Sequence, residues 1–212
     1  MNTNTASTSS TTGTKSPSLG ERFIAALKRA KAVVVDPVGM WPQIKNEAGD
    51  EKSLYRDFLL MMMAVSPVCQ FIGQCLFGEG KAGEILGLGL VMYVFGLVLV
   101  YIMALVLLKL SGVFGGSTTR LTCLRFVAYS YSASFLLGFL ALLPFGLIGL
   151  LSGILSLYSL YIFYSGIPTM TGVPAERSFG FFAAAIASVI GVSLLFGILT
   201  SPVVKLFMPA SV

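Results

Sequence analysis

The stretch ILGLGLVMYVFGLVLVYIMALVLL, residues 85–108, decides the fold class of this chain. It contains no charged residue over 24 positions, and an α-helix needs about 20 apolar residues to cross the hydrocarbon core of a bilayer. The whole chain agrees: 56% of its 212 residues are hydrophobic and 11% are charged, against about 25% charged in a soluble domain. The sequence therefore predicts an all-α integral membrane protein.

Further apolar stretches bring the predicted number of transmembrane helices to five. The spans lie at about 58–76, 85–108, 126–143, 147–164 and 180–200. Ser66-Pro67 interrupts the first span, and membrane helices tolerate a proline when neighbouring groups satisfy the freed carbonyl. We therefore expect a kinked helix there rather than a re-entrant loop. Pro144 separates the third and fourth spans, which predicts a tight hairpin. Residues 58–212 would form one five-helix transmembrane domain.

The residues ahead of the first span divide into a tail and an amphipathic segment. Residues 1–18 are rich in Ser and Thr and have too few apolar side chains to pack, so we predict a disordered tail. Residues 19–57 begin with an amphipathic helix. Its predicted apolar face is Phe23, Leu27, Ala30 and Val34, and its polar face is Arg22, Lys28, Arg29 and Lys31. Two readings stay open: the helix lies on the cytoplasmic membrane surface, or it packs on the transmembrane core.

A proline- and tryptophan-containing segment follows this helix. Pro37 ends the helical pattern, because a proline disfavours helical backbone in the residue before it. Trp41 is the only tryptophan of the chain and precedes Pro42, and tryptophan is enriched at membrane–water interfaces. We predict a hinge with a turn at Gly39, in which Trp41, Pro37 and Pro42 form a candidate interfacial anchor.

The distribution of Lys and Arg predicts the orientation. With the N-terminus in the cytoplasm, twelve of the fourteen cations lie on the inner side and two on the outer side. Five spans would then place the C-terminus outside. Because most of the cations gather before the first span, they indicate contact with lipid headgroups and not with nucleic acid.

The residue types present argue against catalysis. The chain has no histidine, which excludes Ser-His-Asp and Cys-His catalysis and imidazole-based metal sites. Its three cysteines have no C-x-x-C spacing, so neither a zinc site nor a disulfide framework is indicated. The predicted spans hold no ionisable residue, although proton-coupled transporters need one. We predict a non-enzymatic protein with no catalytic residue, metal or cofactor.

Polar residues in and beside the spans form a candidate intramembrane polar site, which comprises Gln70, Gln74, Tyr129 and Tyr131. The two glutamines share one face of the first span, so they could line a small polar pathway or bond to a neighbouring helix. The tyrosines suit a pathway or an interfacial aromatic belt. A pathway would make the protein a channel or transporter for a neutral or lipid-like solute.

Small residues in the last two spans favour close helix packing, either within the chain or between two copies. They are Gly149, Gly153, Ser156, Gly180, Ala184, Ala187 and Gly191. A homo-oligomer or another membrane protein is therefore a possible partner, besides membrane lipids.

Four motifs carry a resemblance to a known family. They are DPVGMWPQIKNE (36–47), FIGQCLFG (71–78), AYSYSASFLLGFLALLPFGLIGLL (128–151) and YSLYIFYSGIPTMTGVP (158–174). In this order, after a basic helix, they resemble the Yip (Ypt-interacting protein) domain family of five-span membrane proteins, and in particular its bacterial branch. The resemblance covers about residues 19–205.

The resemblance implies a protein of the bacterial cytoplasmic (inner) membrane. Eukaryotic members bind prenylated small GTPases of the Rab type and help to shape or traffic membranes. This chain has VSPV (65–68) where those relatives carry an acidic motif, so GTPase binding is doubtful here. The function we expect is the organisation or scaffolding of membrane components, with transport of a neutral or lipid-like solute as the alternative.

Overall fold

The computed structural model describes residues 18–77, 82–137 and 145–207, and every regular element within these ranges is a helix. The predicted all-α fold class is therefore confirmed for the described part of the chain. The predicted disordered tail lies outside it, apart from Ser18.

Two helices precede the bundle. Helix α1, Leu19–Val35, starts with a capping box: the backbone N–H of Glu21 donates to Ser18 Oγ (3.3 Å), and the N–H of Ser18 donates to the Glu21 carboxylate (2.7 Å). Asp36 then caps helix α2, Pro37–Lys45, by accepting from the N–H of Gly39 at 3.0 Å. The predicted turn at Gly39 is wrong, because an Asp cap followed by proline in the first helical position starts a new helix at once.

The first predicted span is the second half of a longer continuous helix. Helix α3, Glu51–Leu54, runs through a π-helical turn at Tyr55–Leu59 into α4, Leu60–Phe77. Pro67 lies inside α4 without ending it. The segment is thus helical, as predicted, rather than a re-entrant loop.

The remaining elements are α5 (Ala82–Val113), α6 (Arg120–Ser130), α7 (Ser132–Leu137), α8 (Phe145–Thr171), a 3₁₀ turn (Ala175–Arg177) and α9 (Ser178–Phe207). Three helical segments of the described chain are long and apolar enough to cross a membrane: Glu51–Gly73, Leu86–Val113 and Ala175–Pro202. They correspond to the first, second and fifth predicted spans.

The other two predicted spans are only partly described. Helix α8 includes the whole of the fourth span, but many side chains near its start fall outside the described set. The third span begins in α6 and α7, and its end lies outside the described residues together with the Pro144 hairpin. The number of five spans therefore stays a prediction.

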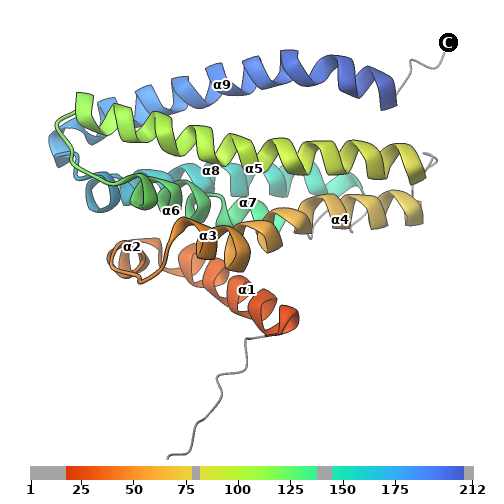
Figure 1. The fold of residues 1–212 in the computed structure, drawn as a ribbon, viewed down its shortest axis with the longest axis horizontal. Coiled ribbons are helices and arrows are strands. Elements are labelled where there is room, and N and C mark those ends of the chain that lie inside the picture. The colour runs from red at the N-terminus through yellow and green to blue at the C-terminus, as the bar shows by residue number, and fades with distance from the viewer. Residues whose placement is uncertain (1–17, 78–81, 138–144, 208–212) are drawn as a thin grey trace, which may run out of the picture.

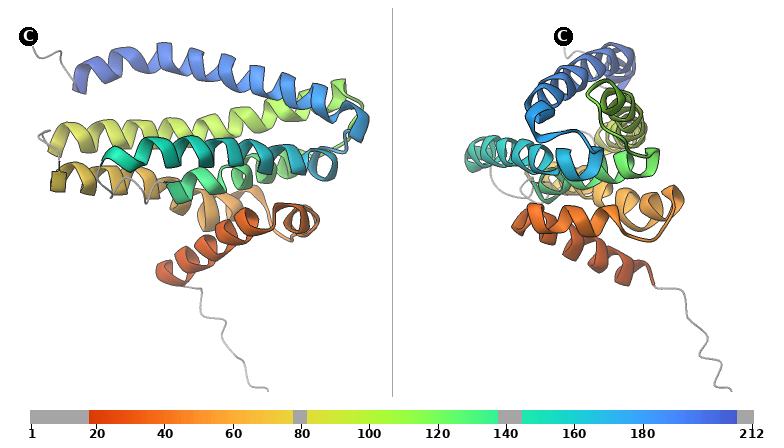
Figure 2. Two further views of the ribbon diagram at one scale, coloured as in Figure 1. Left: turned by 180° about the vertical axis from the view of Figure 1, so that it is seen from behind. Right: turned by 90° about the vertical axis from the view of Figure 1, so that its left-hand side faces the viewer.

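The four long helices α4, α5, α8 and α9 run side by side along the long axis of the molecule (Figures 1 and 2). Helices α1 and α2 lie across one side of this bundle, and α9 forms the opposite edge. Helix α2 packs on α8, whereas α1 packs on α7, α4 and the π-helical turn. The N-terminal segment is thus part of the packed structure.

The buried face of α1 differs from the predicted face by a small rotation. Its fully buried residues are Ala26, Ala30 and Val33. Leu27 and Val34 are only partly buried. Small side chains bring α1 close to the bundle, in agreement with the second of the two readings, packing on the core. The rotation also brings Arg29, predicted to be solvated, against the protein.

The predicted small-residue stripes do not contact another helix at every position within the described part of the chain. A Cβ atom on Gly180 would lie 3.0 Å from the ring of Phe114, which indicates a close contact. A Cβ on Gly153 or Gly191 would meet no described atom within 4 Å. Among the described residues, the tight packing predicted for the stripes is therefore found at Gly180.

Candidate functional site

A buried arginine connects the bundle to the linker between α2 and α3. Arg125 of α6 is 5% exposed. Its guanidinium donates to the carbonyl of Ile44 (3.3 Å) and to that of Gly49 (3.1 Å). Ile44 lies in the last turn of α2, where carbonyls carry the negative end of the helix dipole. Arg125 therefore closes the end of α2 and fixes the linker at residues 46–50.

A second arginine meets the same linker from α1. Arg29 forms an ion pair with Glu47 (2.6 Å between Nη2 and Oε2) and lies over the ring of Tyr129, 5.8 Å from its centroid. Its Nε is buried and has no hydrogen-bond partner among the described residues. The two arginines thus approach the linker from opposite elements.

These groups line a charged cavity of about 380 Å³ between α1, the linker, the α3–α4 helix and α6. Its polar lining consists of Arg29, Arg125, Glu47, Asp50, Asp57, Ser53 and Tyr129. Each carboxylate in the cavity has a partner: Arg29 for Glu47, Ser53 for Asp50 and Arg56 for Asp57. This arrangement suits the binding of a small polar or zwitterionic group, and it holds the linker in place.

Asp50 closes the start of α3. Its carboxylate accepts from the backbone N–H of Ser53 at 2.9 Å, while Ser53 Oγ accepts from the N–H of Asp50 at 3.1 Å. These hydrogen bonds to Ser53 lower the pKa of the Asp50 carboxyl from its ordinary value of 3.8. The group is therefore ionised at neutral pH, and its carboxylate accepts from the first turn of α3.

A separate apolar cavity of about 220 Å³ lies inside the bundle. Helices α5, α6, α7, α8 and α9 contribute its walls, and hydroxyl groups interrupt an otherwise apolar lining. The hydroxyl-bearing residues are Ser130, Tyr131, Ser134, Ser156 and Ser159. Ser134 and Ser159 lie 3.3 Å apart between their Oγ atoms. The size and chemistry of the cavity suit a small neutral molecule.

The structure places Trp41 in the protein interior. Its exposed fraction is 0%, its Nε1–H donates to Ser165 Oγ at 3.0 Å, and its ring meets Phe126 edge-on at 5.3 Å between centroids. Pro37 is buried and Pro42 is exposed. Because no face of the indole is left for lipid headgroups, we replace the interfacial-anchor reading of Trp41: this residue docks α2 on α8 and α6.

The four residues of the predicted polar site are not brought together. Tyr129 lines the charged cavity and Tyr131 lines the apolar one. Gln70 is exposed on α4, where its amide donates to Ser66 Oγ at 3.4 Å. The side chain of Gln74 lies outside the described set. Gln70 therefore lines neither cavity, and a pathway through the two glutamines and two tyrosines has no support in this geometry.

Arg125 and Arg29 are the residues that the sequence analysis missed. Arg125 lies just before the predicted third span, which starts at Phe126, whereas the helix begins at Arg120. The signal for this earlier start is Thr119, whose hydroxyl accepts from the N–H of Thr122 at 3.2 Å. A Ser or Thr before a helical pattern is a typical N-cap.

Comparison with known proteins identifies the family. A sequence model of the Yip1 domain matches residues 31–198, from the second half of α1 to α9. The chain belongs to the Yip1 domain family. The "Inner membrane protein YohC" of Escherichia coli K12 is 30% identical over 151 residues, which cover 66% of this chain and 76% of the relative. The protein of the same name in Escherichia coli O6:H1 matches equally. No solved structure matches the chain.

The family membership confirms the predicted resemblance to the bacterial Yip branch. The relatives are named as inner membrane proteins, which agrees with the helices that are apolar enough to span a membrane. The matched region includes α2 and the linker to α3. The docking of Trp41 therefore lies within the matched region, whereas the lining of the charged cavity also includes Ala25, Ala26 and Arg29, which precede it.

Proposed function

We propose that this Yip1-family protein is a non-enzymatic organiser of the bacterial inner membrane, and that it presents its N-terminal helices to another membrane protein. The N-terminal platform, defined as residues 19–50, comprises α1, α2 and the linker to α3. The observation that supports the proposal is the firm attachment of this platform to the bundle. A scaffold needs such attachment, because a partner bound to a loose segment would not be positioned relative to the membrane.

Four contacts, spread along the platform, attach it to the bundle. Besides Trp41 and Arg125, Tyr158 of α8 donates to the carbonyl of Val34 at 2.6 Å. Lys45 Nζ donates to the carbonyl of Thr169 at 2.7 Å. They tie α1, the end of α2 and the linker to α6 and α8. Such widely spaced contacts leave the platform little freedom to move alone.

The positions of the cations favour a cytoplasmic location for the platform. The loop before α6 and the end of α8 lie at one end of the bundle, since Thr118 Oγ1 donates to the carbonyl of Met170 at 2.8 Å. Arg120, Arg125 and Arg177 lie on or beside these segments, and α2 docks at the same end (Figure 1). Positively charged ends face the cytoplasm in inner-membrane proteins. We therefore assign the N-terminus to the cytoplasm and, with five spans, the C-terminus to the outside.

The platform also presents apolar side chains away from the bundle. Ile24, Val35 and Val38 are large apolar residues that remain exposed on α1 and α2. A partner that covered these side chains would remove apolar surface from water, which favours association. The partner we propose is another membrane protein, and we do not assign this surface to a small GTPase.

Site-specific photo-crosslinking in native membranes tests this function. A photoreactive amino acid is placed at Val38 on the platform and, as a matched control, at Ile190, an exposed apolar position on α9. We expect one recurrent protein adduct from position 38 and none of that mass from position 190. Identical adduct patterns at both positions, or none at position 38, would reject the scaffold.

The apolar cavity favours a second function, the transport of a neutral or lipid-like solute. If this is the activity, Ser134→Leu, which fills a hydroxyl-lined wall, should abolish saturable flux in liposomes. Gln70→Leu is the control because Gln70 lies outside the cavity. Saturable flux that Ser134→Leu abolishes and Gln70→Leu preserves would replace the scaffold function by transport. An absence of flux would mean that the cavity is a packing defect.

A further inference from the structure

A groove runs between the start of α1 and the outer face of α4, and its volume is about 670 Å³. Its walls are almost entirely apolar, with Phe23 of α1 on one side and Met61, Ala64, Val65 and Val68 of α4 on the other. Among the described residues that line it, the charged ones are Arg22 and Arg56. The groove is thus apolar along α4 and cationic at its N-terminal end.

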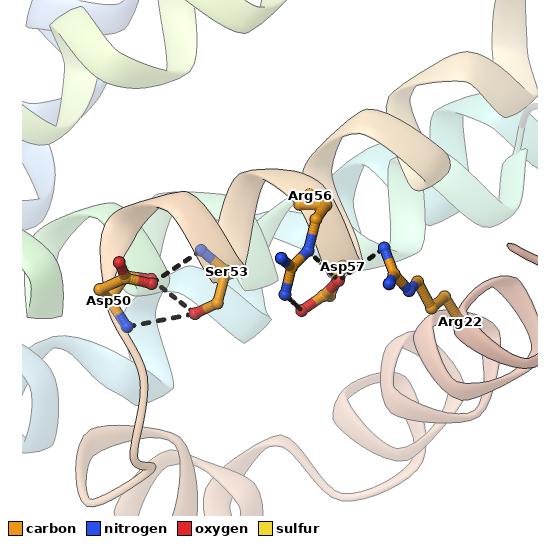
Figure 3. A network of polar contacts seen from close by, with 5 residues as sticks. All are labelled: Arg22, Asp50, Ser53, Arg56 and Asp57. Atoms are coloured by element: carbon orange, nitrogen blue, oxygen red, sulfur yellow. Dashed lines mark hydrogen bonds and ion pairs between the residues drawn. The ribbon is translucent and has the colours of Figure 1, made fainter. Parts of the chain in front are cut away.

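The two arginines share a single carboxylate. Arg56 donates to both oxygens of Asp57 at 2.9 and 3.1 Å, and Arg22 lies 3.7 Å from the nearer oxygen. Figure 3 shows Asp57 between the two guanidinium groups. Arg56 and Arg22 thus place two guanidinium groups at this end of the groove, and Asp50 adds a negative charge that acts on Arg56 and Asp57. Arg56 uses two of its five N–H donors on Asp57, and most of its side chain is exposed.

The depth of the groove fits one lipid leaflet. The groove lies on the apolar helix Glu51–Gly73, which is able to cross a membrane. Cys69, at the far end of the lining, lies thirteen positions after Arg56, which corresponds to about 20 Å of helix. Half of a bilayer hydrocarbon core is about 15 Å thick. A cation at one end and an apolar channel of leaflet depth are the two features that a phospholipid requires.

We propose that this groove is a binding site for one anionic phospholipid, whose phosphate contacts Arg56 and Arg22 and whose acyl chain lies along α4 beneath α1. The site does not depend on the platform's having a protein partner. The N-terminal tail is a poor alternative occupant, since residues 1–17 are Ser- and Thr-rich and have few side chains that would fill an apolar channel.

The test uses native mass spectrometry of the full-length protein in mild detergent, titrated with phosphatidylglycerol or phosphatidylcholine. We expect the wild type to retain one phosphatidylglycerol and to prefer it to phosphatidylcholine. Surface arginines attract anionic lipid by about fivefold each, so Arg22→Gln with Arg56→Gln should weaken retention by about 25-fold. Lys28→Gln removes one charge from α1 outside the groove and should leave retention unchanged.

A second variant and a competitor separate the lipid from other ligands. Ala64→Phe narrows the apolar part of the groove and should expel the lipid while both arginines remain. Inorganic phosphate or glycerol 3-phosphate at millimolar concentration should not displace it, because neither can occupy the apolar channel. Competition by these soluble anions would assign the arginines to free phosphate and overturn the lipid site.

Four other results would also overturn the proposal. They are equal retention of both lipids, unchanged retention in the double arginine variant, higher retention after deletion of residues 1–17, and a second copy of the chain in place of the lipid mass. None of them bears on the crosslinking at position 38, so failure of the lipid site and failure of the scaffold are distinguishable.

Discussion

The contact between Gly166 and the aromatic rings of α2 and α6 gives a quantitative prediction. A Cβ atom on Gly166 would lie 2.6 Å from Cε2 of Trp41 and 2.6 Å from Cε2 of Phe126. Carbon atoms in contact prefer about 3.5–4.0 Å, so Gly166→Ala would overlap both rings by about 1 Å. Overpacking of this kind costs about 1–3 kcal/mol.

The same helix supplies the control. Gly153 also lies in α8, and a Cβ there would meet no described atom within 4 Å. Both substitutions gain the same helix-propensity benefit, about 1 kcal/mol. Gly153→Ala should therefore be neutral or stabilising. We predict that Gly166→Ala is less stable than Gly153→Ala by about 1–3 kcal/mol, the overpacking cost alone.

The fluorescence of Trp41 provides the assay, because it is the only tryptophan of the chain. Its buried indole should emit at short wavelength and resist acrylamide quenching in the wild type and in Gly153→Ala. In Gly166→Ala we expect emission at longer wavelength, stronger quenching and a lower thermal midpoint. If the two variants share one midpoint and one quenching constant, the docking of α2 on Gly166 is refuted.

Three further predictions concern the linker, its cap and the orientation. Arg125→Met should destabilise the protein by about 2–4 kcal/mol in thermal unfolding, because the buried carbonyl of Ile44 and the part-buried carbonyl of Gly49 lose a charged donor. Acid should weaken the N-cap of α3. Hydrogen bonds to Ser53 lower the pKa of Asp50 in the folded protein, so the stabilisation from this cap is fully present above about pH 4, the ordinary pKa of the group. It is lost as the pH falls through the lower pKa of the folded state. Proteolysis of the linker should then rise. Membrane-impermeant maleimide should label the exposed Cys75 in spheroplasts, but not Cys123, where burial raises the thiol pKa to about 11.

Each of these experiments has a discriminating control. Arg125→Lys should recover only part of the stability, since one ammonium group cannot replace the planar fork; full recovery would mean that charge alone matters. Asp50→Asn should make proteolysis insensitive to acid, and a variant that keeps the wild-type pH profile would remove Asp50 from the explanation. Labelling of Cys75 from the cytoplasmic side alone would reverse the proposed orientation.

The membrane class was predictable because the signal is local. Residues 85–108 are apolar all round, and a helix of this kind is either buried in the core of a large protein or crosses a membrane. The capping box of Ser18 and Glu21 likewise lies within four residues, so the start of α1 follows from the sequence. Hydropathy therefore predicts which helices are long and apolar enough to cross a membrane, and the Ser18 cap predicts where α1 begins.

The position of Trp41 was not predictable in this way. An indole beside a proline ahead of an apolar span suits both a lipid interface and a docking pocket. The choice depends on Ser165 and Gly166, which lie 124 and 125 residues further along the chain. The role of Arg125 was not predictable for a similar reason: its acceptors are backbone carbonyls, and these carry no signal in the sequence.

The π-helical turn at Tyr55–Leu59 determines how α3 is rotated about the helix axis relative to α4. The N–H of Leu60 bonds to the carbonyl of Tyr55, five residues back instead of four. This one extra residue rotates what precedes it by about 100° relative to α4. Deleting one residue between Arg56 and Leu60 would restore a regular helix and turn the guanidinium away from α1. Arg56 would then no longer lie at the end of the groove, although the apolar walls would keep their length. The π-helical turn therefore fixes the direction of the Arg56 side chain relative to the apolar face of α4.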